Sequence, residues 1–309
     1  MFRYLLIVAI VTMTIGGVIY ADDEVHQEVP QKSNPITVDI GLYLLNIENF
    51  DVKTGGYIID FYLSMESDKP MLSTNFEFMN GRSLSIDKVI DEPNNKFFRI
   101  RANLAIDLDL HKFPFDRHSL LVKLEDKTIT ADKQIYRVKS EQSGVDPNVH
   151  LFGWDVKSYE TNIDLHEYKV YNEVYSQYRF AVNIERSSAS SIVKFFLPVG
   201  IILIISILAV FVSLDRVIIR LNMMTMSLLT AVFFHTNINA SIPGISYLTI
   251  ADRLMVGTYI SIMFNILFSF IATQAWDTKG DEQGERFYII AQVVVPMATI
   301  VGFILCLIL

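Results

Sequence analysis

Short runs of alternating apolar and polar residues fill the chain between residues 36 and 186, and turn-forming residues separate them. An alternation with a period of two is typical of strands that bury one face. Such runs cover residues 40–47, 57–65, 97–104, 119–125, 154–159 and 175–184. Many short strands at this spacing predict an all-β sandwich over residues 36–190, and a domain of this length can bury an adequate hydrophobic core.

The pattern changes abruptly after Arg186. Four nearly continuous apolar segments follow, at residues 192–214, 217–241, 250–273 and 287–309. A helix of about 20 residues spans the ~30 Å hydrocarbon core of a bilayer, so each segment is long enough to cross a membrane. The sequence therefore predicts a transmembrane domain of four helices over residues 191–309, joined by short connections.

The second apolar segment is unusually polar for a helix surrounded by lipid. Alternating steps of four and three residues place one set of side chains on a single face, polar at both ends and bulky in the middle. The set is Asn222, Met226, Leu229, Phe233, Thr236 and Ala240. Such a stripe suits a helix that faces water at its ends and narrows a pore in the middle, where an apolar constriction gates by dewetting. The alternative is a helix buried in a membrane bundle, with hydroxyl groups bonded to its own backbone.

Residues 1–21 have the organisation of a signal peptide, with a basic start at Arg3, an apolar run and a plausible cleavage region directly before Asp22. An uncleaved membrane anchor is the alternative. In either case the flexible leader expected at residues 22–35 begins outside the cytoplasm, and the sandwich follows it there. Four spans then return the C-terminus to the same side. This order predicts a multi-pass protein of the cell membrane, and of the inner membrane in a Gram-negative host.

Composition narrows the classes of function. The formal net charge is −8, and acidic residues outnumber basic ones by 28 to 19 between residues 22 and 186. An acidic domain argues against nucleic acid as a partner and mildly favours cations near it. The single cysteine, Cys306, excludes an intramolecular disulfide and a cysteine-based metal site. No nucleophile elbow, phosphate-binding loop or zinc motif occurs, so we expect no catalytic residue, no metal site and no cofactor.

Several local motifs occur in an order that is typical of one family. They comprise a loop between two strands, a strand that begins Gly-Trp after a long loop, a proline in the first span, and an Arg and a Pro that frame the second. These residues are Phe113-Pro114-Phe115-Asp116, Gly153-Trp154, Arg186, Pro198, Arg220 and Pro243. Over roughly residues 36–309 the chain resembles the pentameric ligand-gated ion channels, the Cys-loop receptor superfamily, and within it the prokaryotic members without the cysteine pair.

The resemblance implies a homopentamer in a lipid bilayer, with the second span of each copy lining a central pore. Asn222 would then lie near the cytoplasmic constriction. Leu229 and Phe233 would form the gate, because an ion in an apolar ring loses hydration and gains no replacement ligands. Movement would pass from the sandwich to the pore through a coupling region. The residues implied for coupling are Phe113, Pro114, Phe115, Asp116, Arg186 and Pro243.

The chain departs from the family at the ion filter and at the agonist site. Ile218 and Ile219 precede Arg220, where cation-selective relatives carry an acid, so cations are only weakly favoured among permeant monovalent ions. The tryptophan-rich segments of the agonist site are not evident, and the run over residues 69–80 is short. The aromatic candidates for agonist binding through cation–π contacts are Phe61, Phe98, Tyr136, Tyr168 and Tyr171. Trp154 is expected in the core.

His235 lies in the second span, off the stripe described above. An ionisable residue inside a membrane span is a functional candidate by default, and histidine titrates in the accessible pH range. A hydrogen bond to a neighbouring helix is the alternative role. The sequence thus leaves three functions open: a channel gated by a small-molecule agonist, a channel of the same fold gated by protons, and a membrane-anchored extracellular sensor that does not conduct.

Overall fold

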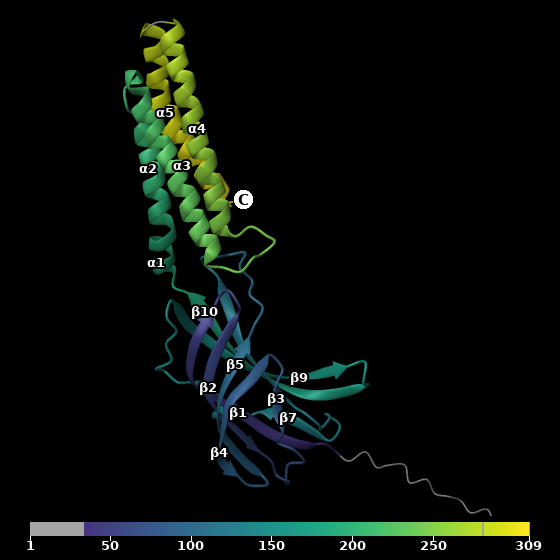
Figure 1. Cartoon of the computed structure of the whole chain (residues 1–309). Helices are drawn as coiled ribbons and strands as arrows, with labels where there is room; N and C mark the ends of the chain where they lie inside the picture. The colour runs from purple at the N-terminus through teal and green to yellow at the C-terminus, as the bar shows by residue number, and fades with distance from the viewer. Residues whose placement is uncertain (1–33, 280, 309) are drawn as a thin grey trace, which may run out of the picture. The chain divides into compact units, whose positions relative to one another are not determined.

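The computed structural model describes residues 34–279 and 281–308, so the expected signal peptide and almost all of the leader lie outside the described residues. Strands occupy the chain up to Arg186, and long helices follow (Figure 1). The strands are β1 (Ile36–Asp51), β2 (Gly56–Glu66), β3 (Phe76–Phe78), β4 (Gly81–Asp91), β5 (Asn95–Ala105), β6 (Arg117–Asp126), β7 (Gln134–Val138), β8 (Gly144–Val145), β9 (Trp154–Tyr168) and β10 (Glu173–Arg186).

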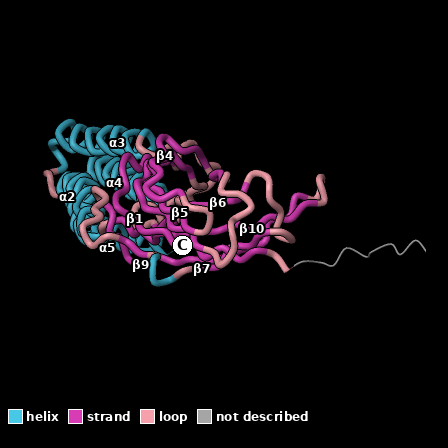
Figure 2. The backbone as a smooth tube through the Cα atoms, turned by 90° about the horizontal axis from the view of Figure 1, so that it is seen from below, coloured by secondary structure: helices cyan, strands magenta, loops and turns pink. Residues whose placement is uncertain are grey.

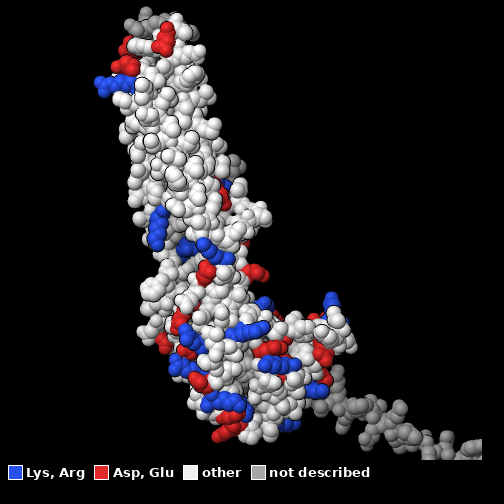
Figure 3. Space-filling model, viewed as in Figure 1, with Lys and Arg blue, Asp and Glu red and all other residues white. Residues whose placement is uncertain are grey.

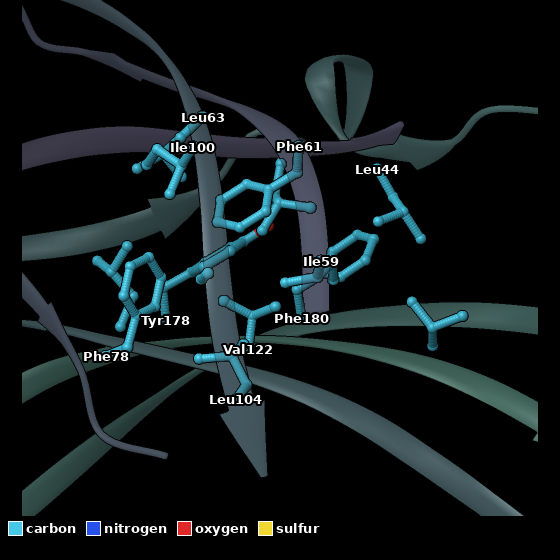
Figure 4. Close-up of a cluster of buried hydrophobic side chains, with 14 of the residues drawn as sticks. Leu44, Ile59, Phe61, Leu63, Phe78, Ile100, Leu104, Val122, Tyr178 and Phe180 are labelled. Atoms are coloured by element: carbon cyan, nitrogen blue, oxygen red, sulfur yellow. The ribbon is translucent and has the colours of Figure 1, made fainter. Parts of the chain in front are cut away.

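The strands form two sheets around one hydrophobic core. One sheet has the order β4-β5-β2-β1-β7, with β8 also paired to β1, and the other has the order β3-β6-β10-β9. Successive side chains of a strand point to opposite faces, so Ile59 and Phe61 of β2 lie on the core side and are fully buried. In Figure 4, Phe61 lies among side chains that include Tyr178 and Phe180 of the other sheet. The expected all-β sandwich is confirmed, with mostly antiparallel pairs and with β1 paired in parallel to β7 and β8.

All six predicted runs lie inside strands of the structure, namely β1, β2, β5, β6, β9 and β10. The alternation misses β4, an edge strand whose residues are all exposed. Because β4 has no buried face, its sequence does not need to alternate between polar and apolar residues.

The helical part contains α1 (Ser188–Ser191), η2 (Ile192–Phe196), α2 (Leu197–Val210), η3 (Leu214–Arg216), α3 (Val217–Ala240), α4 (Ile250–Lys279) and α5 (Asp281–Ile308). Helices α2, α3, α4 and α5 run side by side (Figure 2). Three stretches, Ser188–Val210, Leu214–Ala240 and Ile250–Thr278, are long and apolar enough to cross a membrane. The fourth apolar helix, Tyr288–Ile304 within α5, is shorter over the described residues, so a fourth span stays a prediction.

The helix boundaries correct the predicted spans at both ends. The helix α2 ends at Val210 although the first apolar segment runs to residue 214, and α4 continues to Lys279 although the third segment ends at residue 273. Apolar composition marks where lipid ends, whereas a helix continues as long as its backbone hydrogen bonds do. In Figure 3 the surface over the middle of these helices carries almost no Lys, Arg, Asp or Glu, and charge returns at their far ends.

Candidate functional site

Every residue of the predicted pore-facing stripe on α3 is exposed on the single chain. Met226, Leu229 and Phe233 have 62%, 48% and 63% of their surfaces exposed. The residues at the two ends of the stripe, Asn222, Thr236 and Ala240, are exposed as well.

The opposite face of α3 packs against its own bundle. Its buried residues are Arg220, Met224, Ser227, Ala231 and Ile238. At about 100° of rotation per residue, these residues and the stripe fall on opposite sides of the helix. The Thr236 hydroxyl does donate to the Val232 carbonyl at 2.9 Å, but it does so on the exposed face. The stripe is therefore the surface that α3 turns away from its own chain.

His235 joins α3 to α4 through both ring nitrogens. Its Nε2 lies 3.0 Å from Oδ1 of Asp252, and its Nδ1 lies 3.0 Å from the hydroxyl of Tyr259. The other carboxylate oxygen of Asp252 caps α4 by accepting the backbone N–H of Thr249 at 2.9 Å. The structure thus has the hydrogen bond between helices that was one of two roles considered for His235.

The loop that contains Phe113 packs on the start of α4. The backbone N–H of Ala251 donates to the Phe113 carbonyl at 3.1 Å, and that of Ile250 donates to the His111 carbonyl at 3.2 Å. The His111 ring also stacks on the ring of Tyr247 in the α3–α4 link, with centroids 3.7 Å apart. These contacts connect the sandwich directly to the α3–α4 link and to the start of α4.

The same loop packs on the first membrane helix through aromatic rings. The Phe113 ring meets Phe195 edge-on at 5.3 Å between centroids, and Phe115 lies 5.9 Å from Phe196. Phe195 and Phe196 belong to η2, a π-helical turn at the beginning of the first span. Phe113 is almost completely buried at this contact. The loop therefore touches two membrane helices at once.

Asp116 forms a buried charge network. Its carboxylate accepts hydrogen bonds from Arg186 at 2.7 and 3.1 Å and from Nε2 of His118 at 2.7 Å. Burial by itself would raise the pKa of Asp116, but the hydrogen bonds from His118 and Arg186 outweigh it, so this pKa lies below its usual value. The Arg186 guanidinium also lies over the rings of Trp154 and Phe113, at 4.3 and 5.0 Å.

The structure therefore brings together five of the six predicted coupling residues: Phe113, Pro114, Phe115, Asp116 and Arg186. Pro243 lies in the α3–α4 link. Among the described residues, however, it is Tyr247 of this link that contacts the Phe113 loop. Besides its stacking, the Tyr247 hydroxyl accepts the backbone N–H of Leu110 at 2.9 Å. Sequence reasoning expected the link over residues 243–249 near this loop but singled out Pro243 within it, whereas Tyr247 makes the contact.

For three of the predicted ligand-binding residues the prediction is wrong, because their side chains are buried. Phe61 and Phe98 are 0% and 2% exposed in the sandwich core, and Tyr136 is 5% exposed. Phe61 shares its phase along β2 with Ile59 and Leu63, and that phase points inward. These rings pack against other side chains and offer no face to a ligand. Trp154 lies in the core, as expected.

The other two candidates lie at the β9–β10 turn beside a group of acids. Tyr168 ends β9, and Tyr171 is 72% exposed in the turn. Both line a cavity whose other lining residues are Glu77, Glu125, Asp126, Lys127, Glu173 and Tyr175. Four carboxylates and three tyrosines against one lysine make this surface strongly anionic and aromatic.

Glu125 is the buried centre of this cavity. It accepts hydrogen bonds from Nδ1 of His166 at 2.6 Å, from the Tyr168 hydroxyl at 3.2 Å and from the Gln177 amide. Burial, followed by the charge of Glu125, raises the pKa of Tyr168 to about 12. In Asp126, Oδ1 accepts two backbone N–H groups, while the buried Oδ2 has no partner among the described residues. The acids were not recognised from the sequence, because no spacing rule connects them to the β9–β10 turn.

Comparison with known proteins places these features in a family. No protein-family model matches the chain. The chain is 22% identical over 280 residues to a proton-gated ion channel of Gloeobacter violaceus, which covers 82% of this chain and 76% of that protein. It is also 24% identical over 170 residues to a gamma-aminobutyric acid receptor subunit beta-like protein of Drosophila melanogaster, covering 55% of this chain and 34% of that protein. The chain is thus a relative, at modest identity, of the pentameric ligand-gated ion channels of the Cys-loop receptor superfamily.

Proposed function

We propose that five copies of this chain form a ligand-gated ion channel in which α3 lines the pore and Leu229 and Phe233 form the gate. The observation that carries the proposal is the exposure of the α3 stripe opposite the buried face of the same helix. A helix that turned this stripe to lipid would expose the side-chain amide of Asn222 to hydrocarbon, at a cost of a few kcal/mol for an unsatisfied polar group. Water in a pore removes that cost.

The rings of Leu229 and Phe233 side chains, called the collar below, explain how the pore would close and open. A ring of five leucines and, one turn further out, five phenylalanines holds water poorly when it is narrow. A small outward tilt of the helices widens and wets it. The acidic sandwich enriches cations near the outer mouth, which weakly favours cations among the permeant monovalent ions.

The cavity at the β9–β10 turn is the proposed agonist site, and its chemistry fits a small organic cation. An ammonium group is attracted both by carboxylates and by the faces of tyrosine rings. Tyr171 lies at the tip of the hairpin and can close over a ligand that reaches Asp126 and Glu125. The Drosophila relative is named for an amino acid with an ammonium group, which agrees with this ligand class.

Cysteine scanning of α3 tests the channel proposal. In a Cys306→Ser background, single cysteines at Met226, Thr236 and the buried control Ala231 are treated with a charged methanethiosulfonate reagent during current recording. We expect modification and block at Met226 and Thr236, and no effect at Ala231. A purified pentamer that never conducts across pH and amine ligands would instead favour the non-conducting sensor.

A second candidate function, gating by protons, is supported by the hydrogen bonds of His235. With neutral His235, Nε2–H donates to Asp252 and Nδ1 accepts from the Tyr259 hydroxyl. On protonation, Nδ1–H donates to Tyr259, whose own proton can turn to the Ala231 carbonyl at 3.4 Å. The network can therefore accommodate both charge states of the ring. A relative named as a proton-gated ion channel agrees with this candidate.

A further inference from the structure

The side chain of Phe152 is completely exposed on the single chain, at 102% of its reference area, although it lies in a well-formed turn. The Trp154 N–H closes this turn by donating to the Leu151 carbonyl at 2.9 Å. Gly153 has φ of 83°, the left-handed value that the third position of a type II turn requires. Val149, only 7% exposed, anchors the preceding loop in the sandwich core. A firmly held turn therefore presents one phenyl ring to solvent.

This turn lies where the chain enters the membrane. The Ser187 N–H donates to the Gly153 carbonyl at 3.1 Å, and α1 begins at the next residue, Ser188. The first exposed apolar residue of the span, Ile192, follows about 7 Å further along a helix. Phe152 is thus close to the start of the first apolar helix.

A cavity opens at the same level, at the outer end of α3. It is lined by His235, Asn239, Ile242, Pro243, Leu248 and Val256, among others. Leu248 and Val256 at its rim are 59% and 41% exposed. The α3–α4 link that forms this rim is joined to the sandwich through the stacked rings of Tyr247 and His111. The cavity therefore lies at the boundary between sandwich and membrane, like Phe152.

We propose that Phe152 of one copy fills this cavity on the neighbouring copy, an inference that rests on the proposed homopentamer. The ring of Phe152 is too exposed to touch the cavity of its own chain. An apolar tip and an apolar-rimmed cavity at one level on a single chain make a head-to-tail contact, and such contacts close into rings when the rotation between copies allows it. The cavity is then complete only with a residue from the next copy.

A neighbouring copy explains the surroundings of Phe152 better than lipid does. His150 and Asp155 flank the turn and are exposed. A charged side chain beside a lipid-inserted ring is costly, because it is drawn toward hydrocarbon. One aromatic ring inside a polar rim is instead the usual composition of an interface hot spot.

The contact would tie the sandwich of one copy to the pore helix of the next. His235 and Asp252 also line the cavity, so a seated phenyl ring would shield this pair from water. Outward movement of the α3–α4 link would loosen the ring. The opening of one subunit would thereby reach the sandwich of its neighbour.

Disulfide trapping tests the contact. In the Cys306→Ser background, Phe152→Cys and Leu248→Cys are combined, and the detergent-purified protein is oxidised and run on a denaturing gel. We expect a ladder of cross-linked species that reaches the pentamer. The control combines Leu248→Cys with Leu72→Cys. Leu72 is 54% exposed, so a cysteine there is accessible to oxidation, but it lies after the end of β2 that points away from the helices. The control and each single-cysteine variant should stay monomeric on the gel.

A nitroxide on Phe152→Cys gives an independent readout. A neighbouring copy shields the label from both dissolved oxygen and a water-soluble nickel complex. Access of oxygen alone would identify lipid, and access of the nickel complex would identify water; either result overturns the inference. A conducting pentamer that shows no ladder overturns this inference alone. A parent chain that remains monomeric in native mass spectrometry overturns the proposed function along with it.

Discussion

Arg186 is joined to Asp116 by three hydrogen bonds where the last strand meets the first membrane helix. The guanidinium donates two to the carboxylate at 2.7 and 3.1 Å, and the backbone N–H of Arg186 donates a third to the Asp116 carbonyl at 3.1 Å. The carboxylate side chain is completely buried. A bidentate pair of this kind fixes orientation as well as distance. It holds the Phe113 loop against the strand that leads into the membrane.

Breaking this pair should destabilise the protein strongly. Arg186→Gln leaves the buried Asp116 carboxylate without its main partner, and loss of one member of a buried pair costs about 3–5 kcal/mol. Thermal unfolding of the detergent-purified protein measures the effect. The control is Arg117→Gln, because Arg117 pairs with Glu185 on the surface with 75% of its side chain exposed. An exposed pair contributes about 0–1 kcal/mol, so equal losses in the two variants would contradict the assignment.

Acid should remove the contribution of Asp116. The pKa of this carboxyl is lower in the folded protein than in the unfolded chain, where it is about 3.9. Its stabilising effect is therefore complete above about pH 4 and is lost as the pH falls through the folded value. Melting temperatures between pH 6 and pH 3 should fall more steeply for the wild type than for Asp116→Asn. Parallel curves for the two proteins would refute this linkage.

Polar or smaller residues in the collar should make the channel easier to open. Leu229→Ser and Phe233→Ala both improve the wetting of the constriction, so we expect about tenfold lower half-activating ligand concentrations, a change of about 1.4 kcal/mol. Basal current should rise as well. Dose–response recordings measure both quantities. Leu221→Ser is the matched control, since Leu221 is exposed on α3 but lies off the stripe. Unchanged sensitivity and basal current in both collar variants would count against the gate.

Removal of aromatic or acidic groups from the β9–β10 cavity should weaken binding of organic cations. Tyr171→Ala removes a cation–π contact worth about 0.5–2 kcal/mol, which corresponds to a loss in affinity of roughly 2- to 30-fold. Asp126→Asn removes a buried carboxylate oxygen that has no hydrogen-bond partner among the described residues. Binding of tetramethylammonium and of a primary diamine to the detergent-purified pentamer can be measured calorimetrically. Val170→Ala changes the neighbouring residue, which is 90% exposed, and should leave affinity unaltered. Equal affinities in all of these proteins would remove the cavity as an agonist site.

Alternation along the chain was sufficient to find β2 and β5, because both lie inside a sheet and bury one face. The same alternation already indicated that Phe61 was a poor choice as a ligand-binding residue. Phe61 shares its phase with Ile59 and Leu63, so it had to point into the core together with them. An aromatic residue that lies in phase with buried aliphatic residues is therefore a poor candidate for a ligand site.

Contacts between distant segments had no local signal. Tyr247 bonds to Leu110, which precedes it by 137 residues in the chain. Glu125 bonds to His166, which follows it by 41 residues. Each depends on how strands and helices are arranged in space, and no spacing within one element reveals it. The stripe on α3 was predictable for the opposite reason, since the helical period alone places its residues on one face.

The pair formed by His235 and Asp252 should govern any response to protons that originates in the helices. His235→Gln preserves hydrogen bonding but does not titrate, so currents recorded between pH 5 and pH 7 should lose a pH-dependent component. Asp252→Asn keeps the contact but removes the carboxylate that pairs with the imidazole ring, so the pH profile of this variant should also differ from that of the wild type. Asp68→Asn serves as the control, because Asp68 is exposed in the sandwich. If the pH profile is the same in all four proteins, protons act elsewhere, and His235 only holds α3 against α4.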